Sequence, residues 1–294
     1  EIESLYDLYN ATQGNEWQWS RSTMSGNPWI FTADANPCAD DWFGVTCSLA
    51  PVNGNVHVVK LYLEYLNLVG YLPESIGNLT ELSELSFYNN HLNGTITRSI
   101  GTLKNLSYLK LETNDFYKNI PDSFIELSKL TYLNIGNNKL TGSIPPVLCE
   151  LSALTQLQLF ANQLTSTIPA CLEQLKDLTL LVLHTNYLHG TIPSALGNLT
   201  QLQVLSIKSN TLTGPFPAAL NALLQLQDLD VSYNNLTGTI PEYITTFTQL
   251  EYFEVDNNNL QGTLPSGLDS LTLLKLLSVD NNYLSGTIPS ALQY

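Results

Sequence analysis

The sequence predicts an α/β solenoid, a chain wound into successive similar coils, and three observations carry this prediction. The phrase "YNNHLNGTI" at residues 88–96 returns downstream as "GNNKLTGSIP", "HTNYLHGTIP" and "SYNNLTGTIP". Its second asparagine, Asn90, recurs at intervals of 24 residues as far as Asn282. Leucines recur in the same frame, in the order L-x-x-L-x-L-x-x-N-x-L. A fixed period of this length is typical of stacked coils that bury one continuous core.

The period divides the chain into two parts. Residues 59–294 carry ten repeats of 24 residues, and the first of them has Leu66 at the asparagine position. Residues 1–58 lack the period and contain all four tryptophans. Their opening stretch, "IESLYDLYNAT", predicts a helix with four apolar side chains along one face: Ile2, Leu5, Leu8 and Tyr9.

Within one repeat, a short strand alternates between an inner and an outer side. In "LSYLKLETNDF" the leucines point inward, whereas Tyr108, Lys110 and Glu112 point outward, because strand side chains alternate with a period of two. The recurrent asparagine, which we call the ladder asparagine, follows the strand. Its side chain offers both a carbonyl and an amide to a buried turn. We therefore expect the column of asparagines to be scaffold and not a catalytic feature.

Glycine and proline mark fixed positions after each ladder residue. A glycine stands four residues later, as at Gly94, and predicts a turn with positive φ. Lys118 and Ser166 replace it in two repeats. A proline stands seven residues later in every repeat except one, which has Thr97, and is expected to open a short helix at its first turn.

The full consensus of residues 59–294, L-x-x-L-x-x-L-x-L-x-x-N-x-L-x-G-x-I-P-x-x-L-G-x-L, resembles the plant-type leucine-rich repeat of receptor ectodomains and secreted inhibitor proteins. The resemblance implies a right-handed superhelix with a parallel concave β-sheet. It also implies short convex 3₁₀ or α helices and a second short strand near each "GxIP". It says little about the ligand, because this architecture serves many partners.

Residues 1–58 are similar to the amino-terminal cap of the same family, in which a W-x-G-V-x-C motif with paired cysteines closes the core. That motif is present here in "PCADDWFGVTC". The tryptophans could instead form a carbohydrate platform, but cap packing is the favoured interpretation.

Composition excludes several classes of function. The chain has 294 residues, a net charge of −15 and only 13% charged residues. An acidic chain of this kind is unsuited to nucleic acid and to anionic membrane surfaces. No uninterrupted apolar run is long enough to span a bilayer. The chain starts at Glu1 without an apolar leader, which we interpret as a mature or trimmed form of a secreted protein.

Cysteines and glycosylation sequons indicate an extracellular compartment. The four cysteines lack metal-site spacing, and cap spacing and coil adjacency predict disulfides between Cys38 and Cys47 and between Cys149 and Cys171. N-linked glycans are expected at six N-x-S/T sequons. These are Asn10, Asn78, Asn93, Asn105, Asn198 and Asn235.

No catalytic arrangement is visible in the sequence. None of the four histidines lies in H-E-x-x-H, and neither a G-x-S-x-G motif nor a phosphate-binding loop is present. A reactive thiol needs a basic neighbour, whereas Glu150 and Glu173 flank the second cysteine pair. We therefore predict a protein that is not an enzyme and has no cofactor.

The outward strand positions are those that the repeat leaves free for function. They lie six, four and two residues before each ladder position, and neighbouring strands place them in contact. The predicted ligand-binding residues are Tyr62, Tyr88, Tyr108, Tyr132, Phe160, Val182, His184 and Lys208. Exposed aromatic and aliphatic clusters tend to mark interaction sites, but ordinary cross-strand pairing is the alternative.

The far end of the same face is acidic. Its carboxylates are Asp228, Asp230, Glu254, Asp256 and Asp280. They could bind Ca²⁺ or a basic partner. Solvated acids on an acidic protein are the simpler interpretation.

These features favour an extracellular, non-enzymatic recognition domain that binds a protein or peptide on its concave face. The alternative is a structural or adhesive glycoprotein that assembles through its solenoid ends. The last repeat has no closing cap, and its apolar edge would face water. We therefore expect further coils, a cap or a docking partner beyond that edge, which is formed by Leu277, Val279, Leu284, Ile288 and Leu292.

Overall fold

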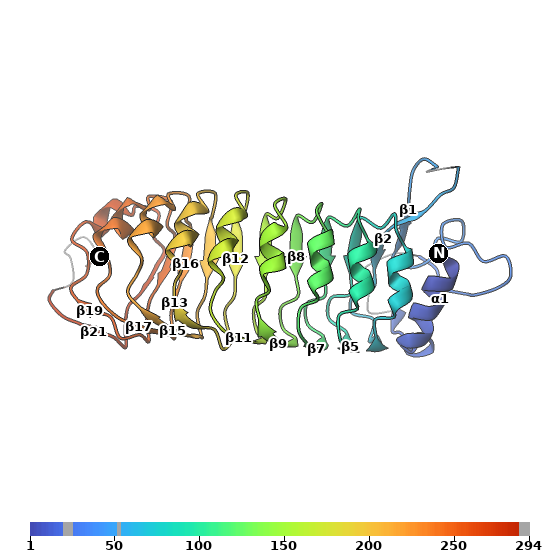
Figure 1. Ribbon diagram of the computed structural model, residues 1–294, viewed down its shortest axis with the longest axis horizontal. Helices are drawn as coiled ribbons and strands as arrows, with labels where there is room; N and C mark the ends of the chain where they lie inside the picture. The colour runs from blue at the N-terminus through green and yellow to red at the C-terminus, as the bar shows by residue number, and fades with distance from the viewer. Residues whose placement is uncertain (20–25, 52–53, 288–294) are drawn as a thin grey trace. The chain divides into compact units, whose positions relative to one another are not determined.

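The structure is a computed structural model that describes residues 1–19, 26–51 and 54–287 (Figure 1). The chain divides into two compact units, residues 1–141 and residues 142–294, and each is described by itself. Two residues of the predicted apolar edge, Ile288 and Leu292, lie outside the described residues. No helix in the described part of the chain is long and apolar enough to cross a bilayer.

The first unit begins with the cap. It contains helix α1 (Ile2–Ala11), the 3₁₀ helix η1 (Gly14–Glu16) and strand β1 (Val45–Cys47), which pairs antiparallel with β2 (Val58–Tyr62). The antiparallel strand was not predicted from the sequence. In α1 the residues Leu5 and Leu8 are fully buried, whereas Ile2 is exposed, so the predicted apolar face is narrower than expected.

Tryptophan packing forms the core of the cap. Trp17, Trp29 and Trp42 are each at most 4% exposed. The indole N–H of Trp17 donates to the Thr12 carbonyl, and that of Trp29 donates to the Phe43 carbonyl, at 3.0 and 2.8 Å. Three of the four tryptophans are therefore packing residues and leave no ring face for a carbohydrate.

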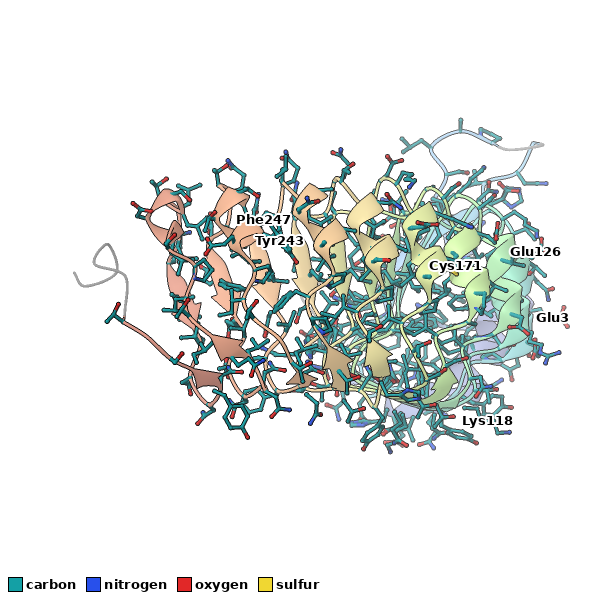
Figure 2. All side chains as sticks on the ribbon, turned by 60° about the vertical axis from the view of Figure 1, so that its left-hand side comes forward. Glu3, Lys118, Glu126, Cys171, Tyr243 and Phe247 are labelled. Carbon is teal, nitrogen blue, oxygen red and sulfur yellow. A yellow bond between two sulfur atoms is a disulfide. The ribbon has the colours of Figure 1, made fainter. Side chains whose placement is uncertain are left out.

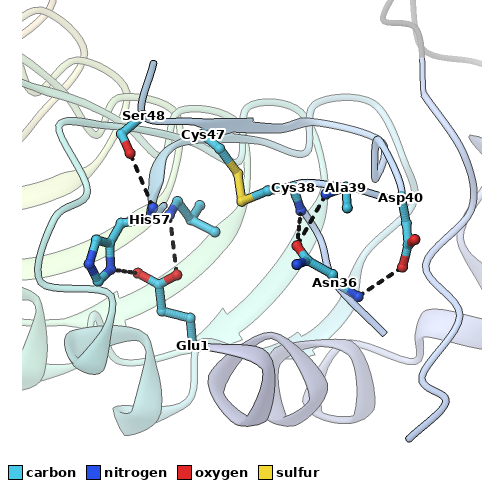
Figure 3. Close-up of a disulfide and its surroundings, with 9 residues drawn as sticks. Glu1, Asn36, Cys38, Ala39, Asp40, Cys47, Ser48 and His57 are labelled. Carbon is cyan, nitrogen blue, oxygen red and sulfur yellow. Dashed lines mark hydrogen bonds and ion pairs between the residues drawn. A yellow bond between two sulfur atoms is a disulfide. The ribbon is translucent and has the colours of Figure 1, made fainter. Parts of the chain in front are cut away.

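A disulfide and an ion pair tie the cap segments together (Figure 3). Cys38 and Cys47 are bonded, with their Cα atoms 5.7 Å apart. A carboxylate oxygen of Glu1 lies 3.0 Å from Nδ1 of His57 (Figure 3). The second carboxylate oxygen of Glu1 accepts the backbone N–H of Val58, where the first strand of the coils begins.

The coils of the first unit repeat three elements. The parallel concave strands are β2, β4 (Glu84–Ser86), β6 (Tyr108–Lys110) and β8 (Tyr132–Asn134). The short lateral strands are β3 (Val69–Tyr71), β5 (His91–Gly94), β7 (Asp115–Lys118) and β9 (Lys139–Ser143). The convex 3₁₀ helices are η3 (Glu74–Asn78), η4 (Arg98–Thr102) and η5 (Asp122–Glu126).

The second unit uses the same three elements. Its parallel concave strands are β10 (Gln156–Gln158), β12 (Leu180–Val182), β14 (Val204–Ser206), β16 (Asp228–Asp230), β18 (Tyr252–Glu254) and β20 (Leu276–Ser278). Its lateral strands are β11 (Gln163–Thr165), β13 (His189–Thr191), β15 (Thr211–Gly214), β17 (Asn235–Leu236), β19 (Gln261–Gly262) and β21 (Tyr283–Leu284). Its convex 3₁₀ helices are η6 (Pro146–Glu150), η7 (Ala170–Gln174), η8 (Ser194–Asn198), η9 (Ala218–Ala222), η10 (Glu242–Thr246) and η11 (Leu268–Ser270). Figure 2 shows Cys171, Tyr243 and Phe247 on this helical side.

The ladder asparagines hold neighbouring coils together, as predicted. Oδ1 of Asn114 accepts the backbone N–H of Leu92 at 2.9 Å, and its Nδ2 donates to the Phe87 carbonyl at 2.8 Å. Asn210 repeats both contacts in the second unit, with Leu188 and Leu183. Each asparagine thus satisfies backbone groups of the preceding coil.

The predicted positive-φ position is present even where glycine is absent. Gly94 has φ of 82°, and the two substitutes, Lys118 and Ser166, have φ of 66° and 73°. A second left-handed position, immediately before each ladder residue, was not predicted. It is occupied by ordinary side chains, for example Tyr233 with φ of 51°.

In most coils the proline is the N-cap residue of the convex helix, one position before the expected first turn; the N-cap of η11 is Gly267 instead. Pro193, for example, is the N-cap residue of η8, with extended backbone angles, and not a residue of its first turn. The helices are short 3₁₀ turns because each coil has only about five residues for them. Where Thr97 replaces proline, its hydroxyl accepts the backbone N–H of Ser99.

Candidate functional site

The concave face of the first unit carries stacked tyrosines. The rings of Tyr108 and Tyr132 are stacked, with centroids 4.4 Å apart, because β6 and β8 pair these two residues in register. Tyr62 meets Tyr108 edge to face at 6.3 Å between ring centroids. All three side chains are half-buried, and burial raises the pKa of Tyr62 and of Tyr108 well above the ordinary tyrosine value.

Charged groups on this face are paired with one another. Nζ of Lys60 lies 2.7 Å from Glu84, which also accepts the hydroxyl of Tyr62. Burial opposes ionisation of Glu84, but the hydrogen bonds from Lys60 and Tyr62 outweigh it and lower the pKa of that carboxyl. Nζ of Lys110 lies 3.7 Å from the centre of the Tyr88 ring. The charged and tyrosine side chains of this face therefore hold one another in place through a network of contacts.

Tyr88 belongs to the same network through its own hydroxyl. A hydrogen bond with Tyr65, together with burial, raises the pKa of Tyr88 to about 12. The rings of Tyr65 and Tyr88 meet edge to face, 5.0 Å apart. All four predicted tyrosines of the first unit thus lie in ring contacts or bonds within their own unit.

The concave face of the second unit begins with an apolar cluster. The rings of Phe160 and His184 are stacked with centroids 4.9 Å apart. Strands β12 and β14 place Leu180 beside Val204 in register, and Val182 lies two residues further along. All five side chains are half-buried. Burial, and after it the charge of Lys208, lowers the pKa of His184, which favours the neutral ring.

The acidic end of the second unit differs from the sequence expectation. Asp230 is only 3% exposed. It accepts the hydroxyl and the backbone N–H of Ser232 and pairs with Nζ of Lys208 at 2.8 Å. Asp256 is 7% exposed and accepts the side-chain amide of Asn257. The interpretation of these two carboxylates as solvated acids is wrong, because both are almost fully buried.

The five carboxylates do not gather at one point. Within the described residues, which include all five, no group of three or more His, Cys, Asp or Glu side chains is placed to hold a metal ion. Asp228 and Glu254 are instead partly buried, and this burial, together with the charge of Asp230, raises the pKa of both carboxyls. Asp280 lies at the exposed edge and accepts the side-chain amide of Asn281. The alternative of a Ca²⁺ site is therefore not supported.

The second disulfide joins neighbouring convex helices. Cys149 in η6 is bonded to Cys171 in η7, with Cα atoms 5.7 Å apart. All four cysteines are paired, so the chain has no thiol for nucleophilic chemistry.

The six predicted glycan acceptors differ in their surroundings. Five are exposed: Asn10, Asn78, Asn93, Asn198 and Asn235. Asn105 is half-buried, donates to the Thr80 carbonyl and accepts Nζ of Lys129. Asn198 donates to Glu173. Glycosylation at these positions stays a prediction.

Sequence reasoning passed over one surface, the lateral strands of the second unit. Their outward residues read as turn residues around each "GxIP" and drew no functional interpretation. The signal was present as the T-x-T pattern of Thr165 with Thr167 in "LTSTIP" and of Thr237 with Thr239 in "LTGTIP".

Sequence models of the leucine-rich repeat match residues 118–164, 176–236, 249–271 and 273–294. The chain belongs to the plant-type leucine-rich-repeat family. A relative described as "Probable LRR receptor-like serine/threonine-protein kinase" of Arabidopsis thaliana is 42% identical over 55 residues, which are 19% of this chain. The chain covers only 6% of that relative's length.

Two solved structures resemble the fold closely. The ectodomain of the Arabidopsis thaliana receptor kinase GASSHO1/SCHENGEN3, in complex with CASPARIAN STRIP INTEGRITY FACTOR 2, is 36% identical with a TM-score of 0.84. That alignment covers 89% of this chain and 31% of the ectodomain. A plant ice-binding protein is 27% identical with a TM-score of 0.82, and the alignment covers 98% of this chain and 88% of that protein.

Proposed function

We propose that this chain is an extracellular, non-enzymatic recognition domain that binds a peptide or protein segment on its concave face. Its resemblance to a receptor ectodomain whose structure holds a bound partner supports this proposal. Its two disulfides fit an oxidising compartment. The sequons are then N-glycan sites.

One observation carries the proposal: the apolar cluster of the second unit. Phe160, Val182 and His184 keep a part of their surface in water although most of the molecule's apolar side chains are fully buried. A neutral His184 ring stacked on Phe160 is a rigid, weakly hydrated contact. Such pre-organised aromatic surface lowers the entropic cost of binding an extended partner.

A display library of linear peptides tests this proposal. Peptides are selected on the wild-type chain, and the affinity of the enriched peptides is measured for Val182→Glu. The matched control is Thr248→Glu, because it adds the same charge at an exposed residue that follows the convex helix η10. We expect roughly tenfold weaker binding by Val182→Glu, since a buried charge opposes each apolar contact.

The melting temperatures of both variants should equal that of the wild type. Two results would overturn the proposal: no peptide enriched on the wild type, or equal affinity for Val182→Glu.

Ice binding is a second candidate function, favoured by a different observation. The alignment with the plant ice-binding protein runs over nearly the whole of both chains, whereas the receptor ectodomain is much longer than this chain. Inhibition of ice recrystallisation by the purified chain would support this function, and its absence would exclude it.

A further inference from the structure

The lateral strands of the second unit present a repetitive hydroxyl surface. We call it the threonine ribbon and define it as the twelve positions three and five residues after the ladder residues Asn162, Asn186, Asn210, Asn234, Asn258 and Asn282. All twelve side chains are exposed. In Figure 1 the strands β13, β15 and β17 lie side by side; β13 and β15 carry His189, Thr191 and Thr213, and Thr237 directly follows β17.

Hydroxyl side chains occupy most of the ribbon. Four stand three residues after the ladder position: Thr165, Thr213, Thr237 and Ser285. Five stand five residues after it: Thr167, Thr191, Thr239, Thr263 and Thr287.

The other three ribbon positions are His189, Pro215 and Gln261, so no position is Lys, Arg, Asp or Glu. The absence of these charges in a chain of net charge −15 argues against an ionic partner. The absence of aromatic and arginine anchors at these positions argues against a protein partner.

The backbone spaces these hydroxyls regularly. Strands β13 and β15 pair in parallel, with Thr191 opposite Thr213. Neighbouring strands lie about 4.8 Å apart, and residues two apart along a strand are about 6.6 Å apart. Where these strands pair, as β13 pairs with β15, the ribbon is a two-dimensional grid of hydroxyl and methyl groups.

Contacts with the next coil hold the outer threonines in place. A Cβ atom built on Gly214 would lie 2.9 Å from the methyl carbon of Thr191, so this methyl packs against the glycine backbone. Thr167 against Gly190 repeats the contact at 2.9 Å. A β-branched side chain held in this way keeps one rotamer, and its hydroxyl has a fixed direction.

The inner hydroxyls are held by hydrogen bonds to the preceding coil. Thr213 donates to the Gly190 carbonyl, and Ser285 donates to the Gly262 carbonyl, each at 3.3 Å. Their oxygen lone pairs stay available to accept hydrogen bonds from water. Both columns are therefore ordered before any partner arrives.

We propose that the threonine ribbon is an ice-binding surface, an inference that rests on the second candidate function. Ice is a periodic array of hydrogen-bonded water molecules. A regular grid of neutral, fixed hydroxyls can hydrogen-bond to its first ordered water layer with little entropic cost of ordering the side chains themselves. Charged groups would hold their own hydration shells, and the ribbon has no Lys, Arg, Asp or Glu. Many weak contacts made together give strong adhesion.

One glycan sequon adjoins the ribbon. Asn235 in β17 pairs with Thr213 in β15, so a glycan on Asn235 would stand beside the grid. The test therefore compares all proteins in an Asn235→Gln background.

The test measures thermal hysteresis and ice recrystallisation inhibition of the full chain. The ribbon variant carries Thr213→Lys and Thr239→Lys. The matched control carries Thr248→Lys and Thr272→Lys, which add the same charge at two exposed positions after the convex helices η10 and η11. We expect the control to keep wild-type activity and the ribbon variant to lose roughly tenfold or more.

The possible outcomes distinguish the role of the threonine ribbon from ice binding by the chain as a whole. Wild-type activity that survives in the ribbon variant would overturn the ribbon assignment and leave ice binding standing. No activity in the wild type would overturn both. If the lysine variant does not fold, Thr213→Val with Thr239→Val replaces it, because this pair removes the hydroxyls and keeps the side-chain shape. Retained activity in that valine variant would equally overturn the role of the hydroxyls.

Discussion

Replacement of one ladder asparagine tests how the coils are held together. In Asn210→Leu the side chain keeps its approximate volume but loses every polar contact. Oδ1 of Asn210 accepts the N–H of the fully buried Leu188 at 3.0 Å. No other hydrogen bond from Leu188 N–H is present within the described residues, so this donor is left without a partner.

The carbonyls that Asn210 contacts are affected less. Asn186 also donates to the Leu183 carbonyl, and Asn234 also donates to the Ile207 carbonyl. The substitution therefore leaves one buried N–H donor without a hydrogen-bond partner, whereas the carbonyl groups that Asn210 contacts keep other partners. An unsatisfied buried backbone group costs about 1–3 kcal/mol, so we expect a loss of about 2 kcal/mol in the free energy of unfolding.

Hydrogen exchange and urea unfolding measure this loss together. Exchange at the Leu188 amide should accelerate strongly, and the unfolding midpoint should fall. The control is Asn259→Leu, because the Asn259 side chain makes no hydrogen bond within the described residues. An unchanged midpoint with a still protected Leu188 amide would refute the reasoning.

Two further predictions concern the second unit. Replacement of both Cys149 and Cys171 by Ala should cost about 3 kcal/mol, because the bond closes a loop of 22 residues, and calorimetry should show a lower melting temperature; an unchanged value would contradict this. Asp228→Asn should stabilise the chain at pH 7. The folded pKa of Asp228 lies above its unfolded value of about 3.9, so the folded state binds the proton more tightly and loses stability as pH rises through this window. In urea titrations, the difference in the free energy of unfolding between the variant and the wild type should vanish below pH of about 3. Equal stability of the variant and the wild type both at pH 7 and below pH of about 3 would contradict the raised pKa of Asp228.

The repeat made the scaffold predictable from the sequence. Asn114 and Asn210 recur at one position of a fixed period, and only a structural role explains the same polar residue in coil after coil. Lys118 and Ser166, which replace the recurrent glycine, also have positive φ, because the neighbouring coils set the backbone geometry at that position. Structural constraints that recur in every coil can therefore be predicted from a single sequence.

The surroundings of individual side chains could not be predicted from the sequence in the same way. Asp230 was expected to face solvent because it occupies an outward phase, yet Lys208 from the previous coil and Ser232 cover it. The position of a residue along a strand predicts on which face of the sheet its side chain lies. How deeply that side chain is buried on the concave face depends instead on the length of the side chains in the neighbouring coil. The threonine ribbon was missed for a related reason. Its residues flank turn glycines, and only the pairing of lateral strands, as of β13 with β15, shows which of them lie opposite one another.

Photocrosslinking of a selected peptide tests the central claim most directly. A photoreactive amino acid is placed at position 182 on the concave face or at position 248 after a convex helix, and the chain is irradiated with an enriched library peptide. Binding on the concave face predicts a crosslink from position 182 and none from position 248. A crosslink from position 248 alone would contradict the claim that the concave face binds the ligand.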